Sequence, residues 1–239
     1  MSSDFKNQIK IFLDGADFDT MVEFSENPQV KGFTTNPSLM KKAGVTDYKG
    51  FCLKVLEKIP TRPISFEVFS DEFSEMERQA LEIDSWGKNV YVKIPITNSL
   101  GESCGPLIKT LTRKGIKLNV TAIFTLEQVC TACDALKDGA PSIVSTFAGR
   151  LADSGFDPMP MMKAASALCR AAGRDIEHLW ASTREPFSIV QAEQCDCHII
   201  TVPGPMIKKM SLFGKDPLEY SLDTVKDFKK DSELAGFKL

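Results

Sequence analysis

The chain has 239 residues, of which 43% are hydrophobic and 26% charged, with a formal net charge of −3. These values are ordinary for a globular protein and exclude a disordered, collagen-like or coiled-coil chain. The pI near 5.6 and the lack of any block of like charge argue against nucleic acid or an anionic membrane surface as the main partner, because either needs a basic face. The polar N-terminus lacks the apolar run of a secretory signal, and no stretch approaches the ~18 apolar residues of a membrane span, so we expect a cytoplasmic protein.

Short β-rich segments alternate with longer stretches of helical period, which is the pattern of successive βα units. The segments predicted as strands are 8–14, 30–34, 63–68, 89–94, 117–122, 142–147, 178–181 and 197–202. The stretches predicted as helices are 18–25, 48–59, 72–86, 101–114, 126–136, 158–172 and 186–194.

This order of elements predicts an α/β fold. No dinucleotide-binding glycine fingerprint follows the first strand, so a closed (β/α)₈ TIM barrel is favoured over a doubly wound sheet. We expect residues 1–239 to form a single barrel domain, with 205–239 as a C-terminal helical tail. Two further helices are predicted in this region, over 206–212 and 222–230, and they would pack over the barrel or over a neighbouring subunit.

The cysteines and histidines offer little material for a metal site. Seven cysteines in a chain without an export signal are expected to be reduced. Cys130 and Cys133 form a C-x-x-C that could be half a zinc site or a redox pair, but they lie in a helix-like run with no second pair at zinc spacing, so we expect helix packing. His178 and His198 lie beside apolar runs and are expected to be structural. Neither a metal nor a cofactor is expected.

Polar residues inside or just after the predicted strands are the candidates for a site, because TIM barrels place their active sites at the C-terminal ends of the strands. Lys93 is the most informative of them, since an ammonium within V-Y-V-K-I-P must either reach solvent or face a polar cavity. Burial disfavours the charged form, and a neutral amine is a nucleophile toward a carbonyl, which is Schiff-base chemistry. The alternatives are an edge lysine or an ion pair.

Two carboxylates and two arginines also lie inside or just after predicted strands. Asp14 ends the first strand, where it could accept a hydroxyl proton or serve as a cap or turn former. Glu67 could relay protons through a water or simply pair with Lys93. Arg150 and Arg184 follow the sixth and seventh strands and suggest a phosphate or sulfonate, although surface ion pairs with the neighbouring acidic residues 153 and 185 are the alternative.

Six motifs together are similar to the short-chain transaldolase family, the class I Schiff-base enzymes that include the fructose-6-phosphate aldolases. They are F-L-D-G-A-D at 12–17, G-F-T-T-N-P-S-L at 32–39, V-Y-V-K-I-P-I-T at 90–97, N-V-T-A-I-F-T at 119–125, F-A-G-R-L-A-D at 147–153 and A-S-T-R-E-P at 181–186. The resemblance covers roughly residues 11–209. The motifs occur in the family's order, and several together are far more specific than any one of them.

The resemblance implies a role for each candidate residue. Lys93 would be the Schiff-base lysine, Asp14 the acid/base at the C4 hydroxyl, and Glu67 with Thr121 the holders of a proton-shuttling water. The residues that would bind the substrate are Thr34, Asn36, Asn119, Ser145 and Ser182 along the sugar chain, Arg150 and Arg184 at the terminal phosphate, and Phe147.

Two positions bear on the reaction type, because the aldolase branch of the family typically has Gln at 67 and Tyr at 147. Glu67 and Phe147 match the transaldolase branch, so the resemblance implies transfer of dihydroxyacetone from a ketose phosphate (fructose 6-phosphate or sedoheptulose 7-phosphate) to an aldose phosphate, a pentose phosphate pathway activity. The alternatives are a fructose-6-phosphate aldolase, a relative acting on another phosphorylated or sulfonated ketose, and a barrel that binds sugar phosphates without turnover. The chain departs from the family at Gly15, where Thr or Ser is usual, and at Thr146, where Pro is common. A homo-oligomer is expected.

Overall fold

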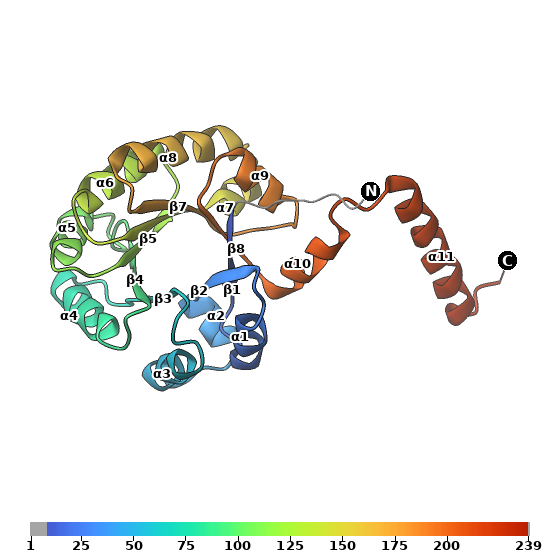
Figure 1. Cartoon of the computed structure of the whole chain (residues 1–239), viewed down its shortest axis with the longest axis horizontal. Coiled ribbons are helices and arrows are strands. Elements are labelled where there is room, and N and C mark those ends of the chain that lie inside the picture. The colour runs from blue at the N-terminus through green and yellow to red at the C-terminus, as the bar shows by residue number, and fades with distance from the viewer. Residues whose placement is uncertain (1–8, 239) are drawn as a thin grey trace. The chain divides into compact units, whose positions relative to one another are not determined.

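Eight parallel strands close into a barrel in the computed structural model, which describes residues 9–238 (Figure 1). Each strand pairs with its neighbours in the sequence, and β8 pairs with β1 to close the sheet. The strands are β1 (Lys10–Asp14), β2 (Val30–Thr34), β3 (Ile64–Glu67), β4 (Val90–Pro95), β5 (Leu118–Ile123), β6 (Ser142–Thr146), β7 (Ile176–Trp180) and β8 (Ile199–Val202). The predicted (β/α)₈ barrel is confirmed, and every predicted strand overlaps an observed one.

Helices connect successive strands and lie outside them (Figure 1). They are α1 (Phe18–Ser25), α2 (Pro37–Lys42), α3 (Tyr48–Lys58), α4 (Phe73–Asp84), α5 (Gly105–Arg113), α6 (Leu126–Leu136), α7 (Ala148–Asp153), α8 (Met159–Ala172) and α9 (Ser188–Gln194). After the last strand the chain continues with α10 (Gly204–Lys209), a 3₁₀ helix at Met210–Leu212 and α11 (Pro217–Ala235). Each predicted helix is present, and α1 and α6 have the predicted bounds.

The short helices α2 and α7 were not predicted. Each has six residues, fewer than two turns, so neither shows a helical period. For α2 a local signal existed, because Asn36 is its N-cap, accepting the Leu39 N–H at 2.9 Å, and Pro37 occupies the first helical position. For α7 the N-cap is Phe147, which offers no side-chain acceptor. Both helices begin directly after strands that end at the mouth of the barrel.

An apolar layer fills the barrel below its mouth. Its buried members are Phe12, Ile143, Leu179, Ala181 and Ile199, with Tyr91 and Phe147 packed against them. Alternate residues of a strand point to the same face, so Asp14, Lys93 and Ser145, each two positions after a member of this layer, also point inward. Along β1, β4 and β6 the inward-pointing side chains therefore change from apolar to polar, which creates a polar mouth above an apolar floor, whereas Leu179 and Ala181 at the end of β7 are both apolar.

Gly32 of β2 is required by this packing. A Cβ at this position would lie 2.6 Å from the ring of Phe12, well inside the closest approach of two carbon atoms. Because Gly32 has no side chain, the ring of Phe12 fills this space in the apolar floor of the barrel.

The two histidines are structural, as predicted. His178 of β7 is fully buried and contacts Ser166 Oγ at 2.8 Å and Thr146 Oγ1 at 3.0 Å through its two ring nitrogens. The Nδ1 of His198 accepts the backbone N–H of His178 at 3.0 Å. Burial lowers the pKa of His178 to about 3, so the ring is neutral in the folded protein.

The C-x-x-C lies within α6, as predicted. Cys130 is exposed, whereas Cys133 is buried with its sulfur 3.8 Å from that of Cys169 in α8. Within residues 9–238 no group of three or more His, Cys, Asp or Glu side chains is placed to hold a metal ion.

The described residues fall into two compact units, 9–207 with the barrel and 208–238 at the C-terminus, and the boundary lies within α10. In the second unit α11 extends over Pro217–Ala235 and is longer than the predicted 222–230. Its N-cap is Asp216, whose carboxylate accepts the N–H groups of Leu218 and Glu219. Leu218, Leu222 and Val225 follow the i, i+4, i+7 spacing of an apolar helix face.

Among the described residues no helix is both long and apolar enough to cross a membrane.

Candidate active site

A cavity of about 530 Å³ opens where the strands end and is lined by every residue to which the resemblance gives a role. These residues are Asp14, Thr34, Asn36, Glu67, Lys93, Asn119, Thr121, Ser145, Phe147, Arg150, Ser182 and Arg184. They come from β1 to β6 and from the segments that follow β2, β6 and β7. The fold therefore brings all the candidates to one cavity.

Lys93 lies in the middle of β4 and is only 7% exposed. Its Nζ donates to the backbone carbonyl of Thr35 at 3.0 Å and lies 3.3 Å from Oε2 of Glu67. Glu67 is directly opposite Lys93 in the β3–β4 pairing. The lysine thus faces a polar cavity, as one prediction had it, and it also makes the ion pair that was the alternative.

Asp14 ends β1 beside this pair. Burial raises the pKa of its carboxyl group, and this effect outweighs the lowering caused by the Lys93 charge and by the hydrogen bond that Thr34 Oγ1 donates at 2.9 Å. The Thr34 hydroxyl is also in hydrogen-bond contact with the hydroxyl of Thr201 in β8. Asp14 is therefore a carboxyl group on which a proton is held more tightly than usual.

The wall formed by β5 and β6 carries amide and hydroxyl groups. Asn119 donates to Ser65 Oγ at 2.9 Å and accepts from Ser145 Oγ at 2.6 Å, and these buried side chains fix one another. Thr121 Oγ1 is buried and has no hydrogen-bond partner within residues 9–238. Thr121 lines the cavity, so this hydroxyl group is available to a molecule that enters it.

The segment after β7 is held in an unusual backbone conformation. Ser182 has a φ of +67°, in the left-handed region. Its carbonyl oxygen lies so close to Gly149 of α7 that a Cβ there would be 1.6 Å away. Only glycine permits this approach, and the contact fixes the position of Ser182 at the rim of the cavity.

The two arginines lie at the rim and are exposed. The Arg184 Nε lies 2.9 and 3.0 Å from the two carboxylate oxygens of Asp153, so one of the two ion pairs considered as the alternative is present. Arg150 lies over the ring of Phe147, with 5.3 Å between its guanidinium carbon and the ring centroid. The Asp153 carboxylate holds the Arg184 fork in place, and both arginines line the same cavity.

Some contributors to the site were not assigned a role by the sequence. Thr35 acts through its backbone carbonyl, which no side-chain pattern reveals, and Thr201 lies in the predicted strand 197–202, from which no candidate was taken. The inward register of Thr201, two positions after the floor residue Ile199, is the signal that could have identified it. At Gly15 a Cβ would meet no heavy atom within 4 Å, so lack of space does not explain the absence of the family's usual Thr or Ser.

The closed barrel with a polar cavity around a buried lysine defines a (β/α)₈-barrel protein with its site at the carboxyl ends of the strands. Two solved structures share this fold. They are a 2,3-dimethylmalate lyase (TM-score 0.56, 12% identity, covering 97% of this chain and 95% of that one) and a dihydrodipicolinate synthase from Rhodopseudomonas palustris (TM-score 0.55, 14% identity, covering 90% and 79%). At these identities the likeness concerns the fold alone.

The chain belongs to the transaldolase/fructose-6-phosphate aldolase family, whose sequence model matches residues 11–238. Proteins named probable transaldolase are similar over most of their length. One from Thermoanaerobacter sp. is 35% identical over 97% of this chain and 100% of its own, and one from Dehalococcoides mccartyi is 34% identical over 84% and 90%. A third, from Methanococcus maripaludis, is 36% identical over 84% and 89%. The resemblance seen in the motifs is thus confirmed, and the chain is an enzyme of this family.

Proposed function

We propose that this enzyme is a transaldolase that moves a dihydroxyacetone unit from a ketose phosphate, fructose 6-phosphate or sedoheptulose 7-phosphate, to an aldose phosphate through a Schiff base on Lys93. The observation that carries the proposal is the Lys93 nitrogen, which is buried beside a carboxylate at the base of a cavity with two arginines at its rim. The names of the relatives from Thermoanaerobacter and Dehalococcoides agree with this activity.

The reaction begins when the ammonium group of Lys93 passes a proton to its ion-pair partner Glu67 and the free amine attacks the ketose carbonyl. The resulting carbinolamine must lose water, which requires a proton to reach its hydroxyl group. Glu67, 3.3 Å from the lysine nitrogen, and Thr121, whose hydroxyl has no partner within residues 9–238, would hold a water molecule that carries this proton. The product is an iminium ion.

Cleavage of the bond between C3 and C4 follows. Asp14 takes the proton of the C4 hydroxyl, the aldose phosphate leaves, and the electron pair of the broken bond moves into the iminium to give an enamine. The raised pKa of Asp14 suits a carboxylate that must accept a proton and later return it. The enamine then attacks the aldehyde of the acceptor, Asp14 returns the proton to the new hydroxyl group, and hydrolysis of the imine frees Lys93.

The remaining cavity residues would bind the substrate. Hydroxyl groups of the sugar chain would meet the side chains of Thr34, Asn36, Asn119, Ser145 and Ser182. The terminal phosphate would lie between Arg150 and Arg184, whose planar guanidinium groups suit bidentate contact with its oxygens.

Transfer is favoured over hydrolytic release because Phe147 has no hydroxyl group. Its ring packs against Phe124, with 5.4 Å between centroids, and presents an apolar surface to the cavity. A phenol at this position could orient water or donate a proton to the enamine, whereas a phenyl ring cannot. The enamine therefore persists until an aldehyde acceptor arrives.

Borohydride reduction in the presence of fructose 6-phosphate, followed by peptide mass mapping, tests the imine and its location. We expect a three-carbon adduct on Lys93 and none in a Lys93→Ala variant that folds normally. An adduct on another lysine, or full activity of Lys93→Ala, would refute the assignment.

Measuring product release with and without an aldose phosphate acceptor tests the reaction type. We expect free dihydroxyacetone to form slowly and to be suppressed when acceptor is present. Equal rates of its release in both cases would instead identify an aldolase.

We also propose that the chain forms a homo-oligomer. The apolar face of α11, which includes Leu218, Leu222 and Val225, needs a surface to cover it, and a second subunit would supply one. Analytical ultracentrifugation should give more than one subunit per particle, and a particle of monomer mass would contradict this.

A further inference from the structure

The backbone hydrogen bonds between the parallel strands β2 and β3 stop one bond short of the candidate active site. The paired residues are Phe33 with Ile64 and Thr34 with Ser65, and the Thr35 N–H extends the pairing by donating to the carbonyl of Ser65 at 3.3 Å. In a regular parallel ladder the next bond would run from the N–H of Glu67 to the carbonyl of Thr35.

Both groups of that expected bond have other partners. The Glu67 N–H donates to the hydroxyl oxygen of Tyr48 at 2.8 Å, and the Thr35 carbonyl accepts from Lys93 Nζ at 3.0 Å. The Tyr48 hydroxyl in turn donates to the carbonyl of Glu67 at 2.7 Å. A single hydroxyl group thus satisfies both backbone groups that Glu67 directs toward β2, and it leaves the Thr35 carbonyl free for the lysine.

Tyr48 is fixed from the outside of the barrel. It is the first residue of α3, and its ring meets that of Phe69 edge to face, with centroids 5.4 Å apart, and that of Trp86 at 6.2 Å. Burial raises the pKa of its hydroxyl group, so Tyr48 remains a neutral donor and acceptor at any physiological pH.

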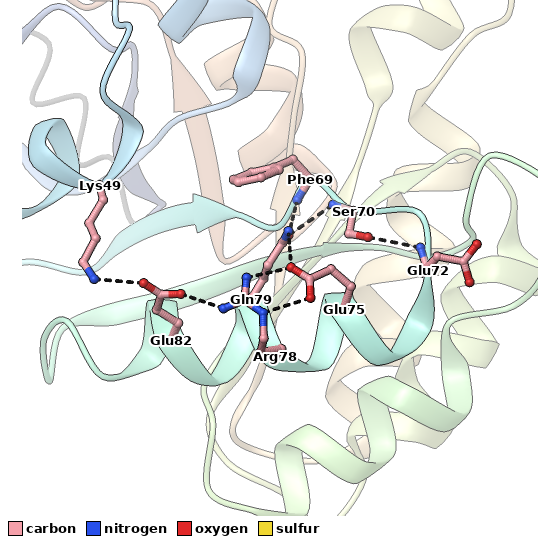
Figure 2. Close-up of polar contacts among 8 residues, drawn as sticks. All are labelled: Lys49, Phe69, Ser70, Glu72, Glu75, Arg78, Gln79 and Glu82. Carbon is pink, nitrogen blue, oxygen red and sulfur yellow. Dashed lines mark hydrogen bonds and ion pairs between the residues drawn. The ribbon is translucent and has the colours of Figure 1, made fainter.

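The backbone that follows Glu67 is held separately. Gln79 of α4 accepts the N–H groups of Phe69 and Ser70 through Oε1, at 2.9 and 3.1 Å. Figure 2 shows that this amide is the end of a chain of polar contacts along α4, formed by Lys49, Glu82, Arg78 and Glu75. The carboxyl end of β3 is therefore restrained at two successive points, and the first of them is Tyr48.

We propose that Tyr48 is a positioning residue for the reaction: its hydroxyl group holds the backbone of Glu67 away from Thr35, and so keeps the Thr35 carbonyl for Lys93 and the Glu67 carboxylate beside the lysine nitrogen. This inference rests on the proposed function. Without the hydroxyl, the Glu67 N–H closes on the Thr35 carbonyl to complete the ladder. Lys93 then loses an acceptor, and the Glu67 carboxylate moves with its backbone.

Kinetics of Tyr48→Phe test the inference. We expect kcat and the rate of borohydride-trapped imine formation to fall about ten-fold while KM changes less than about two-fold, because a displacement of catalytic groups by a fraction of an ångström slows the reaction without removing a substrate contact. Tyr91→Phe is the matched control, since it removes a hydroxyl group from β4 that does not contact Glu67. Equal kinetic effects of the two variants would overturn the inference.

A double-mutant cycle with Glu67→Gln separates positioning from a general loss of stability. The part of the effect that runs through the Glu67 carboxylate is lost in the Glu67→Gln background, so Tyr48→Phe should slow imine formation less there than in the wild type, whereas any loss of thermal stability should persist in full. Additive kinetic effects would contradict a role through Glu67.

A crystal structure of Tyr48→Phe provides a readout that does not depend on activity. The Glu67 N–H should lie within hydrogen-bond distance of the Thr35 carbonyl in Tyr48→Phe and should keep its wild-type position in Tyr91→Phe; a Glu67 backbone that has not moved in Tyr48→Phe would refute the geometry. If the wild-type protein forms no imine on Lys93, the proposed function fails. If the imine forms at the same rate in Tyr48→Phe, the proposed function stands and only the role of Tyr48 fails.

Discussion

Lowering the pH from 7 to 5 should destabilise the barrel through one buried imidazole, that of His178. Its two ring nitrogens contact the hydroxyl groups of Ser166 and Thr146, and burial lowers the pKa from 6.5 to about 3. Between these two pKa values the unfolded chain binds a proton that the folded protein does not. Stability therefore falls as the pH is lowered through this window, and it is regained as the pH rises above about 6.5.

The size of the effect follows from the linkage between protonation and folding. At pH 5 the solution is about 1.5 pH units below the His178 pKa of the unfolded chain, and each unit corresponds to about 1.4 kcal/mol, so His178 alone should remove about 2 kcal/mol of unfolding free energy relative to pH 7. This is a large fraction of the 5–15 kcal/mol that is typical of a folded domain. Asp14 acts in the opposite direction, because its raised pKa makes the folded protein bind a proton more readily than the unfolded chain.

Urea denaturation of the wild type and of His178→Gln at pH 5, 6 and 7 isolates this contribution, since Asp14 is common to both proteins. The wild type should lose about 2 kcal/mol more than the variant over this range. The variant itself is expected to be less stable than the wild type at pH 7, where the His178 hydrogen bonds are intact. Parallel pH profiles for the two proteins would refute the reasoning.

Three further predictions concern the cavity. Arg184→Ala should raise KM for the phosphorylated donor at least about ten-fold with little change in kcat, because the guanidinium would contact the phosphate and not the reacting carbons; steady-state kinetics showing an unchanged KM would exclude that contact. Gly149→Ala should lower kcat/KM by about 10²-fold, because the new Cβ must displace the Ser182 carbonyl. Gly15→Ala is the control and should keep its activity, because the added methyl group meets no atom within 4 Å. Phe147→Tyr should release free dihydroxyacetone from fructose 6-phosphate without an acceptor, and an assay that detects none would remove the argument for Phe147 in the choice of reaction.

One departure from the family pattern has a structural reason. Thr146, at a position where Pro is common in the family, supplies the hydroxyl that meets Nε2 of His178. A proline could not make this contact, and a buried imidazole nitrogen would be left unsatisfied. The departure thus belongs to the packing between β6 and β7 and does not alter the groups that face the cavity.

The strands and longer helices could be predicted because their side-chain periods reflect burial. Most strands are followed within a few residues by polar or small side chains, and α1 and α6 carry a continuous helical pattern over their full length. The helix α11 is longer at both ends than the predicted 222–230; at its start the side chain of Asp216 caps it and Pro217 occupies its first position, two local signals that the prediction did not use. Helices shorter than two turns, such as α7, are too short to show such a pattern.

The amino-acid sequence by itself determined the alternation of strands and helices, the barrel, the family and the residue types that could do carbonyl chemistry, because each of these depends on local periodicity or on motifs. The tertiary structure decided which groups meet. It placed the Thr35 carbonyl on Lys93, left the Thr121 hydroxyl without a partner among the described residues, and brought Tyr48 to the backbone of Glu67. Contacts of this kind involve backbone atoms and residues far apart in the chain, so only the closed barrel, which fixes the register of every strand against its neighbours, could reveal them.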